Sequence, residues 1–395
     1  MKTTVQFILT IMVFSALLIS CKTSDSKVEN PLLYFDLKEM PYKTTLKLSD
    51  LGATDIQYIP LETNEQSVIP RIQKIIRSKN CFLTQSFTDI KMFRNDGSYV
   101  TTIGTVGRGP NEFNVVHDVN INPSDETIYL IDGWQQKFLV YSSTGEFIKT
   151  FKYPARAAVK FGFTQDGILC YNLNSMGDIE TSFYLIDTSG RIIESYPNKY
   201  PWTRNAPTLA FQNENIFYRF NDQLINKEIY SDTLFSIKNN QFEPHAIIST
   251  GNLRITPDVR TQSDVKFITE NFINPMNLFQ FGNFIYYEFY IPVNGHSEGL
   301  AFIGSENGSF RVLIDPEKDL INDLDGGPSI WPKGTWDDGT VVAWTDALEL
   351  KALVSSEAFT KSNPKYPEKK KDLEKLAETL KETDNPVLIL IKFNN

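Results

Sequence analysis

Short runs of apolar residues alternate with polar turns along most of the chain. Residues 90–105 contain an apolar run, a tight turn at Asp96-Gly97 and a second apolar run, and this pattern returns in residues 138–151 and 183–196. Asp-Gly and similar dipeptides suit two-residue hairpin turns, because both central positions of such turns need positive φ. Each copy is therefore predicted to form a β-hairpin.

Weaker copies of the hairpin pattern turn near Asn239-Asn240 and at Asn307-Gly308, and another strand-like run precedes each of the five hairpins. These runs occupy residues 81–83, 127–131, 167–171, 215–220 and 284–289. Three or four short strands in a period of about 45 residues match one blade of a β-propeller, whose repeats span about 40–50 residues. The repeats therefore predict five blades.

The two ends of the chain supply the strands of a sixth blade. Residues 55–61 near the start can pair with residues 340–344 and 386–393 near the end. Closing the ring in this way removes the exposed edge strands of an open array, which favour aggregation. We predict an all-β fold, a six-bladed β-propeller, with five or seven blades as the alternative counts.

One segment has helical periodicity instead. Within residues 367–382 the apolar positions recur at i, i+3, i+4 and i+7, and they are Leu373, Leu376, Ala377 and Leu380. Such a stripe is typical of a helix with one buried face, and a proline suits its first turn. We predict a single C-terminal α-helix packed on the outside of the propeller.

The chain begins with a segment that resembles a bacterial lipoprotein signal. Lys2 is followed by an apolar run of 15 residues from 5 to 19, and the small residue Ser20 precedes Cys21. The run is shorter than the roughly 20 residues that a membrane-spanning helix needs. The resemblance implies cleavage before Cys21 and acylation of that cysteine. An ordinary secretory signal with a coincidental cysteine is the alternative.

These signals divide the chain into a leader over residues 1–20, a polar tether over 21–30 and a propeller domain over 31–395. The tether has the composition of a flexible stalk. The residue after Cys21 is Lys22 and not Asp, which in lipoprotein sorting favours the outer membrane. We therefore expect a lipid-anchored outer-membrane protein that faces either the periplasm or the cell surface.

Composition adds three expectations. Apolar residues make up 41% of the chain and aromatic residues 13%, enough for a large core. The formal net charge of −9 argues against nucleic acid as a partner. Cys81 and Cys170 are expected to be buried free thiols, because the repeat assignment places them in different blades. We also expect a monomer.

Three strings carry a resemblance to a known family. They are G-R-G-P-N-E-F over 107–113, D-G-G-P-S-I-W-P over 325–332, and N-P-V-L-I-L over 385–390. Together they resemble the six-bladed β-propeller lipoproteins of Bacteroidetes, which are similar in shape to NHL-repeat propellers. Family members usually have glycine where Asn111 stands, so this turn departs from the pattern. The family is largely without established activity, so the resemblance implies an architecture more than a function.

The first string supplies one candidate ligand site. Its glycines could let Arg108, Asn111 and Glu112 project toward a ligand at one end of the ring. The alternative is a crossover between blades, in which Pro110 fixes the backbone and Phe113 fills the core. We favour the structural alternative, because turn-rich strings in repeat proteins more often set geometry.

The second string and the histidines supply two further candidates. Asp325 and Trp331 could hold a cation or a sugar, since carboxylates bind Ca²⁺ and indole rings stack on sugars, although Trp331 could equally be a rim aromatic. His117, His245 and His296 fall in three predicted blades and could surround a Zn²⁺ in the channel. The residue after His117 is Asp118, a carboxylate that could orient the imidazole. No local metal motif supports the zinc site.

Two functions remain. The sequence has no G-x-S-x-G elbow, P-loop or C-x-x-C pair, so we favour a non-catalytic binding or scaffold module for a glycan, peptide or protein partner. Its candidate aromatic contacts are Trp134, Trp202, Phe211 and Trp331. The alternative is a Ca²⁺- or Zn²⁺-dependent hydrolase or lyase with its site at the channel mouth. Convergence of three or more His, Asp, Glu or Asn side chains in the channel would favour the enzyme.

Overall fold

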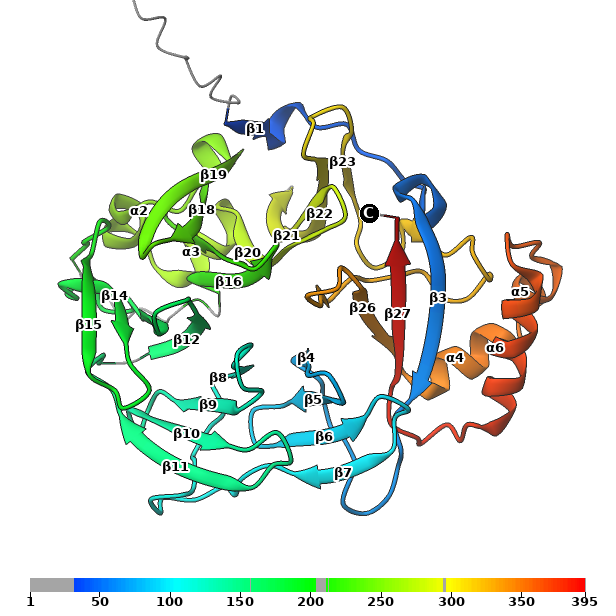
Figure 1. Ribbon diagram of the computed structural model, residues 1–395. Coiled ribbons are helices and arrows are strands. Elements are labelled where there is room, and N and C mark those ends of the chain that lie inside the picture. The colour runs from blue at the N-terminus through cyan, green and yellow to red at the C-terminus, as the bar shows by residue number, and fades with distance from the viewer. Residues whose placement is uncertain (1–31, 157, 204–210, 212, 294–295, 395) are drawn as a thin grey trace, which may run out of the picture. The chain divides into compact units, whose positions relative to one another are not determined.

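The computed structural model describes residues 32–395 apart from 157, 204–210, 212, 294–295 and 395. The predicted leader, Cys21 and the tether lie outside the described residues. The described chain forms six large sheets arranged as a ring (Figure 1). The prediction of a six-bladed β-propeller is confirmed.

Each blade is an antiparallel sheet whose first strand lies nearest the centre of the ring. Blade 1 contains β4 (Lys74–Arg77), β5 (Cys81–Gln85), β6 (Ile90–Arg94) and β7 (Tyr99–Thr102), and blade 2 contains β8 (Asp118–Ile121), β9 (Ile128–Asp132), β10 (Lys137–Tyr141) and β11 (Phe147–Lys152). Blade 3 contains β12 (Ala158–Phe163), β13 (Ile168–Asn172), β14 (Thr181–Ile186) and β15 (Ile192–Pro197). Blade 4 contains β16 (Asn215–Phe220), β17 (Gln223–Glu228), β18 (Thr233–Lys238) and β19 (Gln241–Ser249), and blade 5 contains β20 (Asn274–Phe281), β21 (Phe284–Val293), β22 (His296–Ser305) and β23 (Arg311–Ile314).

Blade 6 combines both ends of the chain, as the sequence predicts. Its strands are β25 (Gly334–Thr335), β26 (Val341–Thr345), β27 (Val387–Phe393) and β3 (Ala53–Pro60). The C-terminal strand β27 lies between β26 and the N-terminal strand β3, which forms the outer edge. All neighbouring pairs are antiparallel. The ring is therefore closed by hydrogen bonds between strands far apart in the sequence.

The segment before β3 follows the outer edges of blades 4 and 5. β1 (Leu33–Asp36) pairs in parallel with β19 of blade 4. Pro41 and Lys43 then exchange backbone hydrogen bonds of 2.8 Å with Leu313 of β23 in blade 5. The next residues form β2 (Leu46–Lys47), which pairs with β24 (Leu320–Ile321). We call residues 33–47 the N-terminal strap. It covers the outer edges of two blades, which would otherwise present unpaired backbone groups.

The predicted hairpins are present, but most of their turns differ from the predicted type. At Asp96-Gly97 only Gly97 has positive φ, and the Gly97 N–H donates to the Arg94 carbonyl. This is a turn followed by a bulge at glycine, and Gly145 and Gly190 repeat it. Both residues of Asn239-Asn240 have positive φ, as a two-residue turn requires. The prediction of two-residue turns was therefore wrong for the three strongest copies.

The helices are more numerous than predicted. The C-terminal helix α6 (Pro367–Thr379) is present outside the ring and ends three residues before the predicted boundary (Figure 1). The other helices are α2 (Pro257–Gln262), α3 (Val265–Asn271), α4 (Ala347–Val354) and α5 (Glu357–Lys361), and the 3₁₀ helices are η1 (Leu37–Glu39), η2 (Leu48–Leu51) and η3 (Gly251–Leu253). Among the described residues, no helix is long and apolar enough to cross a membrane.

Polar side chains join each blade to the next around the centre of the ring. The bonds run from Lys74 to Asp118 (2.8 Å), from Asn120 to the Phe161 carbonyl (2.8 Å), from Arg219 to the Phe163 carbonyl (3.3 Å), from Tyr218 to Gln280 (2.8 Å), from Asn277 to the Lys333 carbonyl (3.0 Å) and from Arg77 to Asp338 (2.8 Å). Each bond satisfies a polar group that the ring would otherwise leave without a partner. Hydrogen bonds therefore link every pair of neighbouring blades around the ring.

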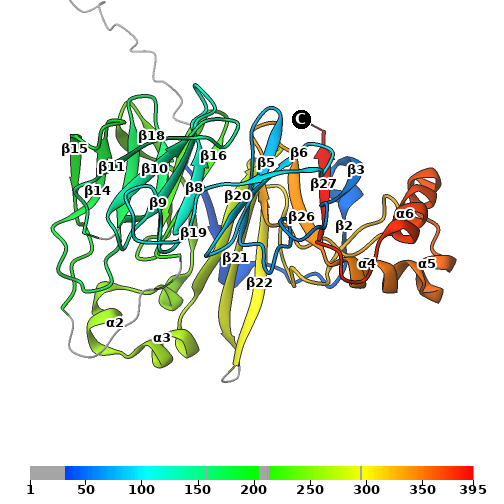
Figure 2. The same cartoon turned by 90° about the horizontal axis from the view of Figure 1, so that it is seen from below.

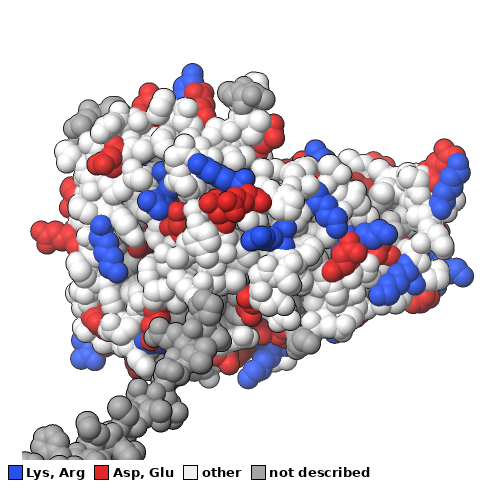
Figure 3. All heavy atoms as spheres, turned by 90° about the horizontal axis from the view of Figure 1, so that it is seen from above, with Lys and Arg blue, Asp and Glu red and all other residues white. Residues whose placement is uncertain are grey.

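One end of the ring carries most of the irregular structure. Strands alternate in direction within a blade, so the connections between blades and the turns between second and third strands lie at the same end. We call this end the loop face, and the described residues of its connections are 61–73, 103–117, 153–156, 198–203, 211, 213–214, 250–273 and 315–333. Figure 2 shows α2, α3, the end of β21 and the start of β22 together on one side of the ring. Elsewhere, on the face shown in Figure 3, basic and acidic side chains are interspersed.

Candidate functional site

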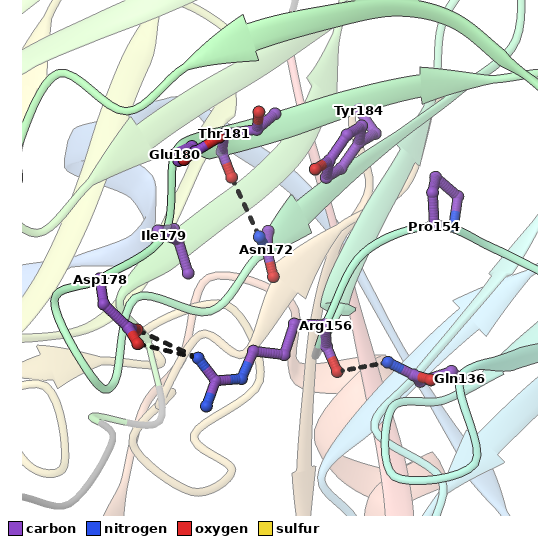
Figure 4. A pocket seen from close by; sticks show the side chains of 9 residues that line it. All are labelled: Gln136, Pro154, Arg156, Asn172, Asp178, Ile179, Glu180, Thr181 and Tyr184. Atoms are coloured by element: carbon purple, nitrogen blue, oxygen red, sulfur yellow. Dashed lines mark hydrogen bonds and ion pairs between the residues drawn. The ribbon is translucent and has the colours of Figure 1, made fainter.

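A pocket of about 410 Å³ opens on the loop face between blades 2 and 3 (Figure 4). Its lining combines amide, carboxylate, guanidinium, hydroxyl and apolar groups from both blades. The residues are Gln136, Pro154, Arg156, Asn172, Asp178, Ile179, Glu180, Thr181 and Tyr184. The volume lies within the range of about 300–1,000 Å³ that is usual for small-molecule sites.

The turn before β10 shapes the wall of the pocket on the side of blade 2. Gln136 has a left-handed backbone, with φ of 51°. Its side-chain amide donates to the carbonyl oxygens of Ala155 (3.2 Å) and Arg156 (2.9 Å). These bonds tie the turn to the connection between the blades. The backbone that carries Arg156 is therefore held in place.

An ion pair crosses the outer part of the pocket. The Nη1 atom of Arg156 lies 3.1 Å from both carboxylate oxygens of Asp178, and both side chains are exposed (Figure 4). Exposed ion pairs contribute little to stability, typically about 0–1 kcal/mol. Both groups can therefore exchange their mutual contact for a ligand at low cost.

The inner part of the pocket is more rigid. Asn172 is buried, and its side-chain amide donates to the Thr181 carbonyl at 3.0 Å (Figure 4). Tyr184 comes from β14 and packs its ring against the core between blades 2 and 3. Glu180 is exposed, and within the described part of the chain its carboxylate has no hydrogen bond or ion pair. The pocket thus offers fixed amide and aromatic groups at its base and free acceptors at its rim.

An exposed tryptophan lies on the same turn as Gln136. Trp134 is 67% exposed, and its ring meets the edge of His117 at a centroid distance of 5.4 Å. The N–H of Gly133 donates to Nδ1 of His117 at 3.0 Å, so the ring proton of neutral histidine is on Nε2. Burial lowers the pKa of His117, which favours this neutral form.

The predicted metal arrangement is not brought together by the fold. His117 precedes β8, and His296 is exposed at the start of β22. His245 lies in β19, and its Nε2 donates to Oε1 of Gln280 at 2.8 Å. Asp118 does not orient His117, because its carboxylate bonds to Lys74 and to the N–H of Phe161. Across the described ranges, no group of three or more His, Cys, Asp or Glu could hold a metal ion.

The loop over residues 107–113 is a crossover between blades 1 and 2, which is the structural alternative that the sequence analysis favours. The carboxylate of Glu112 folds back over the loop and accepts from the N–H of Gly109 at 2.8 Å. Phe113 is buried in the core, and Lys137 donates to the Gly109 carbonyl at 2.8 Å. Arg108 and Asn111 are exposed on the loop face. They do not line the pocket between blades 2 and 3.

Asp325 and Trp331 occupy different environments. Asp325 is fully buried, and its Oδ1 accepts from Tyr58 (3.2 Å), Asn322 (2.6 Å) and the Gly327 N–H (2.9 Å). Burial raises the pKa of this carboxyl group. Asp325 therefore holds the loop together. Trp331 is half-buried and lines a second, smaller cavity.

Of the predicted aromatic contacts, Trp134 is exposed and Trp202 is buried. Trp134 is exposed as predicted, but Trp202 is only 6% exposed and cannot serve as an exposed contact. Its ring lies against the guanidinium of Arg260, which also contacts the ring of Phe211. Arg260 is fully buried and forms an ion pair with Glu214 at 3.4 Å. These residues anchor the connection that contains α2.

The residues that line the pocket carry no motif in the sequence. Arg156 and Asp178 are isolated charges in turns, and Asn172 and Tyr184 belong to ordinary strand patterns. The signal that sequence analysis could have used is positional. Each of these residues lies near a predicted strand end, and the repeat places those ends on one face of the ring.

The comparisons place the chain among proteins without an assigned activity. A family described as a domain of unknown function (DUF4934) matches residues 34–392. The comparison with curated proteins found no match. Similar solved structures include a presumed exported protein of Bacteroides fragilis, with a TM-score of 0.70 and 17% identity over 92% of this chain and 99% of that one. A DUF4221 family member from Bacteroides vulgatus has a TM-score of 0.53 and 12% identity over 87% and 98% of the chains.

A virginiamycin B lyase from Staphylococcus aureus is also similar, with 13% identity over 73% of this chain and 94% of that one. Its TM-score of 0.41 is too low to support an inference about activity. The two Bacteroides structures share the fold of this chain, but at 17% and 12% identity a shared fold does not imply a shared activity. The family match spans nearly all of the described domain. The chain therefore belongs to the DUF4934 family.

Proposed function

We propose that the protein is a lipid-anchored, extracytoplasmic binding module that holds a glycan in the pocket between blades 2 and 3. The observation that carries the proposal is the lining of this pocket. Amide, carboxylate and hydroxyl groups surround Tyr184, and Trp134 stands exposed on the adjoining turn. Sugar rings present both hydroxyl groups and apolar faces, so they match such a mixed lining.

The arrangement also supports binding from the outside. Arg156, Asp178 and Glu180 are exposed at the rim, whereas Asn172 is buried at the base. A ligand can therefore meet the flexible groups first and the fixed group last. The rigid base limits the conformational entropy that is lost on binding.

The proposed location depends on the N-terminal sequence. The apolar leader and Cys21 resemble a lipoprotein signal, and a polar tether separates them from the propeller. The similar protein from Bacteroides fragilis is described as presumed to be exported. We place the protein at the outer membrane, with Cys21 as the acylated residue and the membrane as its lipid partner.

A glycan array probed with the detergent-solubilised lipoprotein tests the proposal. We expect binding to at least one class of glycan. Calorimetry with the best glycan should show binding weakened by about tenfold or more in Glu180→Ala and Tyr184→Phe, which each remove polar atoms of the pocket. Glu146→Ala is the matched control, because Glu146 is an exposed acid in the β10–β11 turn on the opposite end of the ring.

Two outcomes would overturn the assignment. If no glycan binds but a peptide library does, the pocket recognises a peptide. If a glycan binds and all three variants retain the affinity of the unmodified protein, the site lies elsewhere. Circular dichroism of each variant shows whether the fold is retained, so a loss of binding can be attributed to the pocket.

A further inference from the structure

A second cavity of about 170 Å³ opens on the loop face beside blade 5. Its lining consists of acidic and aromatic side chains together with a few apolar groups. The residues are Met276, Glu288, Phe289, Tyr290, Gly299, Asp315, Pro316, Glu317 and Trp331. None of them lines the pocket between blades 2 and 3.

A buried carboxylate is fixed in the wall of this cavity. Glu288 of β21 is 8% exposed. Its Oε1 accepts from the indole N–H of Trp331 at 3.2 Å, and its Oε2 accepts from the hydroxyl of Tyr286 at 3.3 Å. Each oxygen retains capacity for a further hydrogen bond. The group is therefore held in one orientation and can still accept from a ligand.

The aromatic rings provide a surface for a cation. The ammonium group of Lys333 already lies over the ring of Trp331. Tyr290 of β21 also lines the cavity and is 39% exposed. Ring faces attract ammonium groups, and the attraction increases when the site excludes water. This contact shows that the indole of Trp331 can hold a cation, and Lys333 itself is not among the residues that line the cavity.

The charges around the cavity leave a negative balance. Three carboxylates, those of Glu288, Asp315 and Glu317, line it. Two ammonium groups face them, because Lys318 pairs with Asp315 at 2.8 Å and Lys333 lies over Trp331. Burial raises the pKa of Glu288 and lowers the pKa of Lys333 to about 7. The two shifts have opposite effects on the net charge, because the first favours neutral Glu288 and the second favours neutral Lys333, so the negative balance follows from the formal charges.

We propose that this cavity, lined by the rings of Trp331 and Tyr290 and by the carboxylate of Glu288, binds a small organic ammonium ion. The site goes beyond the proposed glycan pocket, since it is built from a different blade and recognises charge. A neutral sugar would gain from the rings but not from the surplus negative charge. The cavity volume limits the ligand to a small headgroup.

Calorimetric titration of the detergent-solubilised lipoprotein with choline tests the proposal. The neutral isostere 3,3-dimethyl-1-butanol and sodium chloride serve as reference titrants. We expect choline to bind with a Kd at or below about 1 mM and the neutral alcohol to bind at least about tenfold more weakly. Sodium chloride should give no binding heat beyond dilution.

Variants separate this site from the glycan pocket. Glu288→Gln keeps an acceptor for the indole N–H but removes the charge, so choline affinity should fall by about tenfold or more. Glu317→Gln, at an exposed position, should weaken choline by about threefold and serves if Glu288→Gln does not fold. Glu180→Gln, in the other pocket, should leave choline binding unchanged.

The proposal fails if choline and its neutral isostere bind equally well, because the cavity would then select shape alone. It also fails if choline does not bind, or if it binds and Glu288→Gln and Glu317→Gln both leave its affinity unchanged. A positive glycan array together with any of these results would refute the ammonium site and leave the glycan pocket standing.

Discussion

In the loop over residues 107–113, the space around each residue determines whether it packs within the loop or remains exposed. The string at residues 107–113 contains two glycines that, from the sequence, could let neighbouring side chains project toward a ligand. In the structure they give room to one side chain, because a Cβ atom on Gly107 would lie 2.0 Å from Oε2 of Glu112. The glycines are therefore required by packing within the loop. Arg108 remains exposed and open to a partner.

Gly107→Ala should destabilise the protein by about 1 kcal/mol, because Glu112 must move and lose its hydrogen bond to Gly109. Urea denaturation measures the change. In a Glu112→Ala background the same substitution should cost less than about 0.5 kcal/mol, since the clash is gone. Arg108→Ala should stay within about 0.5 kcal/mol of the unmodified protein. Equal costs in both backgrounds would contradict this account of the loop.

A second prediction concerns a buried acid. Burial raises the pKa of Glu228 from its usual 4.5 to about 7, with Glu214 acting in the same direction and Lys199 and Lys227 against it. Between these pH values the folded state holds more protons than the unfolded state, so stability should fall as pH rises from 4.5 to 7. This contribution is on the order of 2 kcal/mol. Glu228→Gln should lack it, which urea denaturation at pH 5 and pH 7 would show. Identical pH slopes would refute the assignment.

At the scale of elements, local signals were sufficient for the hairpins but not for the strap or the helices. Each hairpin brings together neighbours in sequence, so its apolar runs and turn residues predict it. β1 and β2 are short and pair with strands more than 200 residues away, so no local pattern reveals them. α2 begins at Thr256-Pro257, and its threonine caps Val259, but six residues are too few for a clear stripe.

The strap should contribute strongly to stability through one side chain. Phe35 of β1 is 1% exposed and meets the ring of Phe302 at 4.8 Å, in space that Gly304 leaves free. Phe35→Ala should therefore cost about 3–5 kcal/mol in urea denaturation. The adjacent Tyr34 is 55% exposed, and Tyr34→Ala should cost less than about 0.5 kcal/mol. Similar losses for both variants would mean that the strap is held by its backbone alone.

At the scale of the whole molecule, the closed ring was predictable and the pocket was not. Closure follows from apolar strands at both ends of the chain, and β3 and β27 do pair. The pocket depends on which turns of blades 2 and 3 face one another, and this depends on the tilt and spacing of the blades. Arg156 and Asp178 are 22 residues apart and meet only across that junction.

The register of β1 with β19 fixes the direction in which the strap runs along the ring. β1 runs parallel to β19, with Leu33 opposite Ala246 and Asp36 opposite Ser249, and Ser249 leads into the loop face. The chain therefore enters β1 away from the loop face and runs toward it.

Cys21→Ala should remove acylation and release the protein from the membrane without affecting the propeller, since Cys21 precedes the strap. Labelling of cells with an alkyne fatty acid should mark the unmodified protein and not the variant, and fractionation should move the variant to the soluble fraction. Cys81→Ala is the matched control, because Cys81 is a buried free thiol in β5 and its loss should leave both label and location unchanged. Persistent labelling of Cys21→Ala would assign the lipid to another residue, whereas membrane association without label would contradict the lipid as the anchor.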